Sequence, residues 1–211
     1  MLNTLFDFLS RRCVMRLGDI ATIRTGLVLG RKKSDAGNDI KESYKLLTLK
    51  NISDDGEIDT SSIDTFDSNE ILDERYLTKE GNILIRLNHP YTTVYIDKKY
   101  IGLLIPSYFA IIEIKDANYL PKYIAWYLNT ERIKHDLERA HAGSRIPTTN
   151  QNTLKQLSID EINLSKQKAL IELYKLHRQE KRLYEQLIQE KDILFKGIAQ
   201  QILQDQSRGN V

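Results

Sequence analysis

Asp97, Glu113 and Lys115 match the bare spacing of a metal-dependent nuclease site, with the last two in a β-rich stretch. In such a site two carboxylates hold a magnesium ion while the lysine assists the attacking water. The pattern has only three positions and is common by chance, and no proline precedes Asp97. His135 and His141 have neither a nucleophile nor a carboxylate at motif spacing, which favours surface or capping roles. A nuclease is therefore a secondary hypothesis.

Other polar and basic residues have the chemistry to contact DNA. Phosphate contacts position a protein on the duplex, whereas side chains that reach base edges read its sequence. Arginine can bridge guanine, and asparagine can bridge adenine. The residues suited to base edges lie on a loop that leaves a predicted strand: Arg86, Asn88, His89, Tyr91 and Thr92. The residues suited to phosphates are Arg31, Lys32, Lys33, Lys45, Ser144, Arg145 and Thr148. Ordinary solvated surface is the competing interpretation for each of them.

Composition indicates an ordinary globular protein. The chain has 211 residues, of which 41% are hydrophobic and 28% are charged, the usual balance of a soluble domain. Its single cysteine, Cys13, cannot form an internal disulfide or supply a set of metal ligands. No apolar run approaches the roughly 18–20 residues that a membrane helix needs. We therefore expect a protein of a reducing cytoplasm.

Charge is unevenly distributed along the chain, although the net charge is only +2. Basic residues outnumber acidic ones in residues 16–50, whereas residues 54–74 carry nine acidic side chains and no basic one. Such an arrangement would give the protein one face suited to a polyanion and another that repels it. Local bias on ordinary surface is the alternative.

Short β-rich segments cluster in the first half of the chain, and a helical pattern follows them. Predicted strands cover residues 44–49, 57–65, 82–87, 94–96, 100–104 and 108–114. Pro121 opens a predicted helix, since proline is best accepted in the first helical turn. A polar loop at 142–152 precedes a last predicted strand at 154–159. The pattern indicates one mixed α/β (α+β) body.

Residues 165–203 contain no proline and one glycine, and their apolar residues follow a helical rhythm. The seam consists of Leu173, Leu176, Leu183, Leu187 and Leu194, with Glu180 and Glu190 in its vacant positions. A repeat near 3.5 residues is what two helices need to face one another along their length. At 1.5 Å per residue the helix would be roughly 60 Å long, longer than the body is wide. The sequence predicts a coiled coil with another long helix; packing on its own body is the alternative.

These features divide the chain into four parts. They are an N-terminal extension at 1–14, the body at 15–162, a long dimerisation or docking helix at 163–205, and a disordered tail at 206–211.

In this order the segments resemble half of a specificity subunit of a type I restriction–modification system. Four stretches carry the likeness: residues 16–26 to the opening of a target recognition domain, residues 44–56 to its first core strand and turn, residues 80–85 to its glycine-acid-isoleucine-leucine strand, and residues 143–171 to the approach to its long helix. Asn82 stands where an aspartate is commoner. The tryptophan that often precedes the opening motif is absent, and the helix entry at 163–167 lacks the usual prolines.

The resemblance implies a non-catalytic subunit that recognises double-stranded DNA and directs a partner adenine methyltransferase and endonuclease. Typical family members hold two recognition domains and two long helices, so a homodimer of this chain would do the work of one full subunit. The resemblance implies no cofactor or metal here, with S-adenosylmethionine on the partner methyltransferase, in a prokaryotic cytoplasm. One further alternative is a helix-paired scaffold or regulator that binds no DNA.

Overall fold

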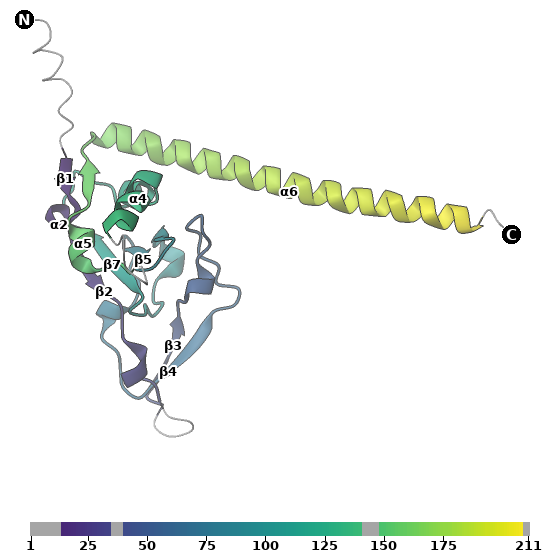
Figure 1. Cartoon of the computed structure of the whole chain (residues 1–211). Coiled ribbons are helices and arrows are strands. Elements are labelled where there is room, and N and C mark those ends of the chain that lie inside the picture. The colour runs from purple at the N-terminus through teal and green to yellow at the C-terminus, as the bar shows by residue number, and fades with distance from the viewer. Residues whose placement is uncertain (1–13, 35–39, 141–147, 209–211) are drawn as a thin grey trace, which may run out of the picture. The chain divides into compact units, whose positions relative to one another are not determined.

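The computed structural model describes residues 14–34, 40–140 and 148–208, without the side chains of Arg31 and of residues 205–208. Most of the predicted extension at 1–14 and the last residues of the predicted tail lie outside this description. The chain divides into two compact units, Met1–Lys168 and Ala169–Val211, and each is considered by itself. Figure 1 labels their helices and strands.

The first unit is built on a four-stranded antiparallel sheet. Its spatial order is β2 (Ala21–Thr25), β7 (Phe109–Ile114), β5 (Ile83–Arg86) and β6 (Thr93–Tyr95). The central strands β5 and β7 are runs of isoleucine, leucine and phenylalanine, which suit a sheet that is covered on both faces. Ile83 lies opposite Ile112 and Leu84 opposite Ile111, and all four are fully buried. These four residues of β5 and β7 lie at the centre of the core.

A separate hairpin consists of β3 (Glu42–Leu46) and β4 (Asp64–Ser68). Tyr44 and Phe66 pair across it and point into a small apolar cluster, while Lys45 points outward because side chains alternate along a strand. Short 3-10 helices connect the strands: η1 (Leu29–Arg31), η2 (Leu49–Asn51), η3 (Glu74–Tyr76) and η4 (Lys98–Tyr100).

The predicted strands at 57–65, 100–104 and 154–159 are only partly correct. β4 begins at Asp64, so most of the first segment is irregular. The second begins in η4 and turns at Gly102, whose φ of 84° is accessible mainly to glycine. The third is the short helix α5 (Gln151–Lys155) followed by β8 (Ser158–Asp160). Asn150 causes this change, because its side chain accepts hydrogen bonds from the backbone at 152 and 153 and caps the helix.

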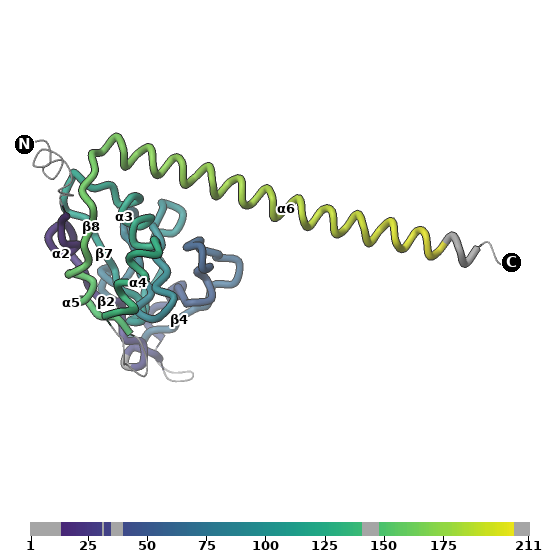
Figure 2. The backbone as a smooth tube through the Cα atoms, turned by 45° about the horizontal axis from the view of Figure 1, so that its top comes forward, coloured from purple at the N-terminus to yellow at the C-terminus, as the bar shows by residue number. Residues whose placement is uncertain are grey.

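The two ends of the body meet. β1 (Val14–Arg16) pairs antiparallel with β8, and the α2 turn (Leu17–Ile20) lies against α5. The apolar helix predicted after Pro121 is α3 (Pro121–Leu128), followed by α4 (Glu131–Ala140), which Figure 2 shows near one another. α3 lies against β6. The mixed α/β fold class is therefore confirmed.

The long helix α6 (Leu164–Arg208) has its first turn fixed to the body by Gln167, whose side chain is fully buried. The amide oxygen of Gln167 accepts from the backbone N–H of Leu120 at 2.8 Å, and its nitrogen donates to the carbonyls of Asn118 and Ile162. A buried amide with its bonds satisfied holds the start of the helix in place.

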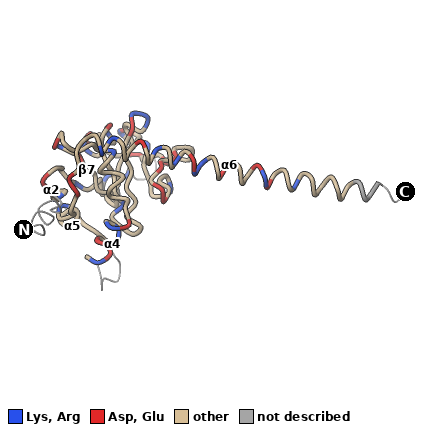
Figure 3. Tube along the Cα trace, turned by 90° about the horizontal axis from the view of Figure 1, so that it is seen from above, with Lys and Arg blue, Asp and Glu red and all other residues tan. Residues whose placement is uncertain are grey.

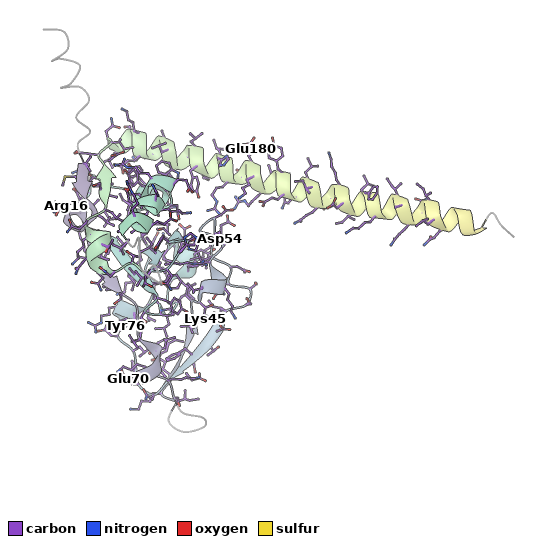
Figure 4. All side chains as sticks on the ribbon, viewed as in Figure 1. Arg16, Lys45, Asp54, Glu70, Tyr76 and Glu180 are labelled. Carbon is purple, nitrogen blue, oxygen red and sulfur yellow. The ribbon has the colours of Figure 1, made fainter. Side chains whose placement is uncertain are left out.

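With this turn included, α6 is a single continuous helix of 45 residues, about 67 Å long at 1.5 Å per residue. Basic and acidic residues are interspersed along it (Figure 3), and its side chains project along its length (Figure 4). The large apolar side chains that are between 49% and 72% exposed on it include Leu173, Leu176, Leu183, Tyr184, Leu187, Ile188, Leu194, Phe195, Ile198 and Ile202. The leucines of the predicted seam are therefore exposed on this unit.

Candidate nucleic-acid interface

The turn after β5 presents two polar side chains to solvent. The N–H of Arg86 donates to the carbonyl of Thr92, and the N–H of Tyr91 donates to the carbonyl of Asn88. These bonds close a tight turn in which Asn88 is exposed and the side chain of His89 is 64% exposed. Asn88 and His89 are the predicted base-edge residues that the turn leaves accessible.

The structure brings the second predicted segment beside this turn. Asn88 and Thr148 form an antiparallel bridge, and the N–H of Thr149 donates to the carbonyl of Leu87 at 2.7 Å. Thr148 is exposed, while Thr149 is buried. Segments 60 positions apart in sequence therefore share one edge, which consists of Asn88, His89 and Thr148. We call these three residues the reading edge. The predicted contacts Ser144 and Arg145 lie outside the described residues.

Tyr91 and Thr92 do not belong to the reading edge, because both side chains are fully buried. Tyr91 has a positive φ of 55° and its ring meets the His89 ring edge-on, with centroids 6.1 Å apart. Burial, and secondarily the charge of Glu138, raises the pKa of the Tyr91 hydroxyl. Tyr91 therefore anchors the turn from inside, which sequence reasoning could not distinguish from an exposed loop tyrosine.

The side chain of Arg86 is also held within the body and does not belong to the reading edge. Its guanidinium donates to the carbonyls of Leu49 and Ile52 at the η2 turn and lies 3.8 Å from the carboxylate of Asp54. The side chain is only 12% exposed. A guanidinium bonded to two backbone carbonyls ties β5 to a turn more than 30 positions earlier, and it is not directed at a base.

Arg86→Met is expected to lower the free energy of unfolding by about 2–4 kcal/mol, because the backbone carbonyls of Leu49 and Ile52 lose a charged hydrogen-bond donor. Urea unfolding followed by circular dichroism measures this loss. Lys45→Met is the matched control, because Lys45 is exposed on β3 (Figure 4). The free energy of unfolding of this variant should differ from that of the unchanged protein by less than about 0.5 kcal/mol. Equal stability of the two variants would contradict the structural role of Arg86.

A carboxylate on α4 lies next to the reading edge. Glu138 is 3.4 Å from Nδ1 of His89 and 3.9 Å from Nδ1 of His135. An open hollow of about 580 Å³ adjoins these groups; its lining residues are His89, Pro90, Glu131, Arg132, Lys134, His135 and Glu138. Glu138 orients the His89 ring, so it is a positioning residue for the edge. Sequence reasoning missed it, since only the His135–Glu138 spacing on one helix was a local signal.

Asn129 holds the strand behind the turn. Its amide oxygen accepts from the N–H of Thr93 at 2.9 Å, and its nitrogen donates to the carbonyl of Thr93 at 2.7 Å. Asn129 follows α3, so this pair of bonds fixes β6 to the helical layer. The turn is therefore supported from the sheet and from the helices, as a recognition loop on a rigid scaffold requires.

Of the residues predicted to contact phosphates, Thr148 lies at the reading edge, and the lysines lie around the β3–β4 hairpin. Lys33 forms a backbone bridge with Ser68 and its side chain is exposed, as is that of Lys45 on the outer face of β3. Lys32 is engaged in an ion pair of 2.7 Å with Glu70. The backbone of Arg31 belongs to η1. The basic candidates thus form a second group on one substructure.

The nuclease candidates do not converge. Asp97 pairs with Lys122 at 3.3 Å, whereas Glu113 pairs with Lys115 at 2.6 Å and with Arg24 at 3.5 Å. The hydrogen bond from Lys115 is the main cause that lowers the pKa of Glu113. Glu113 lies on β7, whereas Asp97 follows β6, and β5 lies between these two strands in the sheet. Among the described residues, no group of three or more His, Cys, Asp or Glu side chains could hold a metal ion.

The fold of this chain is similar to that of solved structures. No family model and no curated protein sequence matches the chain. A chain from a structure concerned with complex assembly and conformational transition of the type I R-M system matches with a TM-score of 0.64 and 14% identity, over 86% of this chain and 47% of that one. The HsdS subunit from Thermoanaerobacter tengcongensis matches with a TM-score of 0.52 and 14% identity, over 80% of this chain and 37% of that one.

These likenesses show that the chain has the fold of those proteins and spans less than half the length of either. The resemblance stated from sequence motifs is confirmed at the level of the fold. Within the described residues, no helix is both long enough and apolar enough to cross a membrane.

Proposed function

We propose that this chain is the DNA-recognition subunit of a type I-like restriction–modification system. The observation that carries the proposal is the combination of one recognition-type body with one 45-residue helix whose apolar face is open. Its fold is that of an HsdS subunit, but it covers 37% of that chain. The apolar face of α6 is exposed and has the heptad spacing that a second long helix would bury, so a second copy is the proposed partner.

In this proposal the body contacts double-stranded DNA through two groups of residues. The reading edge at Asn88, His89 and Thr148 faces base edges, where an asparagine amide can bond adenine in a bidentate manner. The hairpin lysines, Lys33 and Lys45, contact phosphates and set the position of the body on the duplex. Arg31, Lys32, Ser144 and Arg145 remain predicted contacts of the second kind. The net charge of +2 supports a modest phosphate grip.

In this proposal two copies of the chain associate through α6. Two chains that associate antiparallel through Leu173, Leu176, Leu183, Leu187 and Leu194 carry a body at each end of the helix pair. A two-fold axis relates the bodies, so the bound sequence is an inverted repeat interrupted by unread base pairs. The helix pair also docks the methyltransferase subunits, and an endonuclease subunit where one is present.

The chain supplies no catalytic group of its own in this proposal. Methyl transfer to adenine belongs to the partner methyltransferase, which holds S-adenosylmethionine, and this chain determines where it acts. The proposed setting is the prokaryotic cytoplasm. The scaffold alternative differs in one measurable respect, since a scaffold would leave the methylated sequence unchanged when the reading edge is altered.

Methylation mapping tests the proposal. The chain is co-expressed with a candidate partner adenine methyltransferase, the two are co-purified, and modified adenines are located across the host genome. The expected result is one interrupted inverted repeat, methylated only when both proteins are present. Failure to co-purify, or methylation whose sequence does not depend on this chain, would contradict the proposed function.

A further inference from the structure

The open face of α6 follows an 11-residue repeat as well as the heptad spacing of its leucines. Two series show it: Leu173, Tyr184 and Phe195, and Leu176, Leu187 and Ile198. These six side chains are between 49% and 72% exposed. Eleven residues make about three helical turns at 3.67 per turn, close to the α-helical value of 3.6, so the face runs nearly straight along the helix. A heptad seam alone leaves Tyr184, Ile188 and Phe195 unexplained.

A third series places opposite charges in this face. Glu180 and Lys191 are 11 residues apart and are followed by Ile202 at the same interval. Both charged residues are exposed on α6, and each lies between apolar members of the other series. A parallel pair of helices sets each residue against its own copy, which brings Glu180 against Glu180 and Lys191 against Lys191. Like charges at the centre of a helix contact oppose association.

We propose that the antiparallel helix pair of the proposed function has a single register, with its two-fold axis between Glu185 and Gln186. In this register most of the apolar face is matched, while Leu194 faces His177. The facing residues, one from each copy, are Leu173 with Ile198, Leu176 with Phe195, Leu183 with Ile188, and Tyr184 with Leu187. Glu180 of each copy faces Lys191 of the other, so the axis generates two attractive ion pairs.

Other antiparallel registers leave the charges without partners. A shift of one heptad in one direction sets Lys191 against Leu173 and Glu180 against Tyr184. A shift in the other direction sets Glu180 against Ile198 and Lys191 against Leu187. A charge held against apolar side chains loses hydration without compensation. Glu180 and Lys191 therefore select both the direction and the register of the pair.

This register determines the distance between the two ends of the helix pair at which the bodies are attached. The first residues of the two helices, Leu164 in each copy, lie 43 residues of helical rise apart, or about 65 Å at 1.5 Å per residue. The inference deepens the proposed function and rests on it, since it specifies how the two recognition bodies are held apart.

Cysteine cross-linking tests the register in the full-length protein. All variants carry Cys13→Ser, and chains with Leu176→Cys are co-expressed with chains carrying Phe195→Cys under a different tag. Mild oxidation is expected to link the two kinds of chain efficiently. Chains with Leu176→Cys alone should not link to one another, because these positions lie about 28 Å apart in the proposed pair, far beyond the roughly 7 Å limit between bridged Cα atoms. Linking of Leu176→Cys chains to themselves would indicate a parallel pair and overturn the inference.

Charge reversal tests whether Glu180 and Lys191 select the register. Glu180→Lys or Lys191→Glu alone should weaken self-association at least about tenfold, because two attractive pairs become two repulsive ones. The double variant exchanges the charges and should restore association to within about twofold. A double variant as weak as the single ones would overturn the inference.

Failure of the inference is distinguishable from failure of the proposed function. A dimer by light scattering that lacks these cross-links would refute the register and leave DNA recognition in place. Cross-links as expected, with no methylated motif, would refute the function and leave the register in place.

Discussion

Leu183→Glu combined with Leu187→Glu is expected to convert the proposed dimer into a monomer. The two leucines are 57% and 50% exposed in the single chain, at the middle of the open face. Burial of a leucine contributes about 1.5–3 kcal/mol, and the two-fold axis counts each substitution twice. The expected weakening of association is therefore at least about 1,000-fold, measured by analytical ultracentrifugation across a concentration series.

Ile193→Glu is the matched control for this variant. Ile193 is also a large aliphatic residue on α6 and is 64% exposed, but it falls on the opposite side of the helix at 100° per residue. Its association constant should stay within about threefold of the unchanged protein. Equal weakening by Ile193→Glu would contradict the assignment of the contact face, and an unchanged dimer in the double variant would contradict the pairing.

Asn88→Ala is expected to weaken binding to the target sequence at least about 30-fold, because a bidentate base contact is worth about 1–3 kcal/mol and is lost in both copies. The readout is competition binding by the assembled methyltransferase complex against the mapped sequence. Methylation mapping with the same variant should show relaxed sequence preference at one position in each half-site.

Asn118→Ala provides the control for the reading edge, because Asn118 is another exposed asparagine of the body, remote from the turn in sequence. It should leave both affinity and motif unchanged. If Asn88→Ala binds as tightly as this control and methylates the same motif, the reading edge does not contact the bases.

The long helix and the central strands could be predicted from the sequence because their signals are local. The apolar spacing of α6 repeats along one segment, and β5 and β7 are short runs of buried apolar residues. The proline at the start of α3 marks a helix in the same way. Elements of this kind depend little on distant contacts, so residue types and intervals suffice to locate them.

The candidate site could be predicted only in part, because burial of loop side chains depends on distant segments. Arg86, Asn88 and Tyr91 look equivalent in the sequence, yet only Asn88 is exposed. Arg86 is held by carbonyls more than 30 positions away, and Tyr91 turns inward at a positive φ. The approach of Thr148 to Asn88 is also a tertiary contact. The α5 helix is different, since the capping residue Asn150 was a local signal that the strand prediction overlooked.

The central claim is that one recognition body is carried on a helix whose open face belongs against a second copy. Size-exclusion chromatography with light scattering measures this directly on the full-length protein. The expected molar mass is twice that of the 24.5 kDa chain at high concentration, and it falls toward the mass of one chain for the variant with both Leu183→Glu and Leu187→Glu. A mass of 24.5 kDa at every concentration would contradict it.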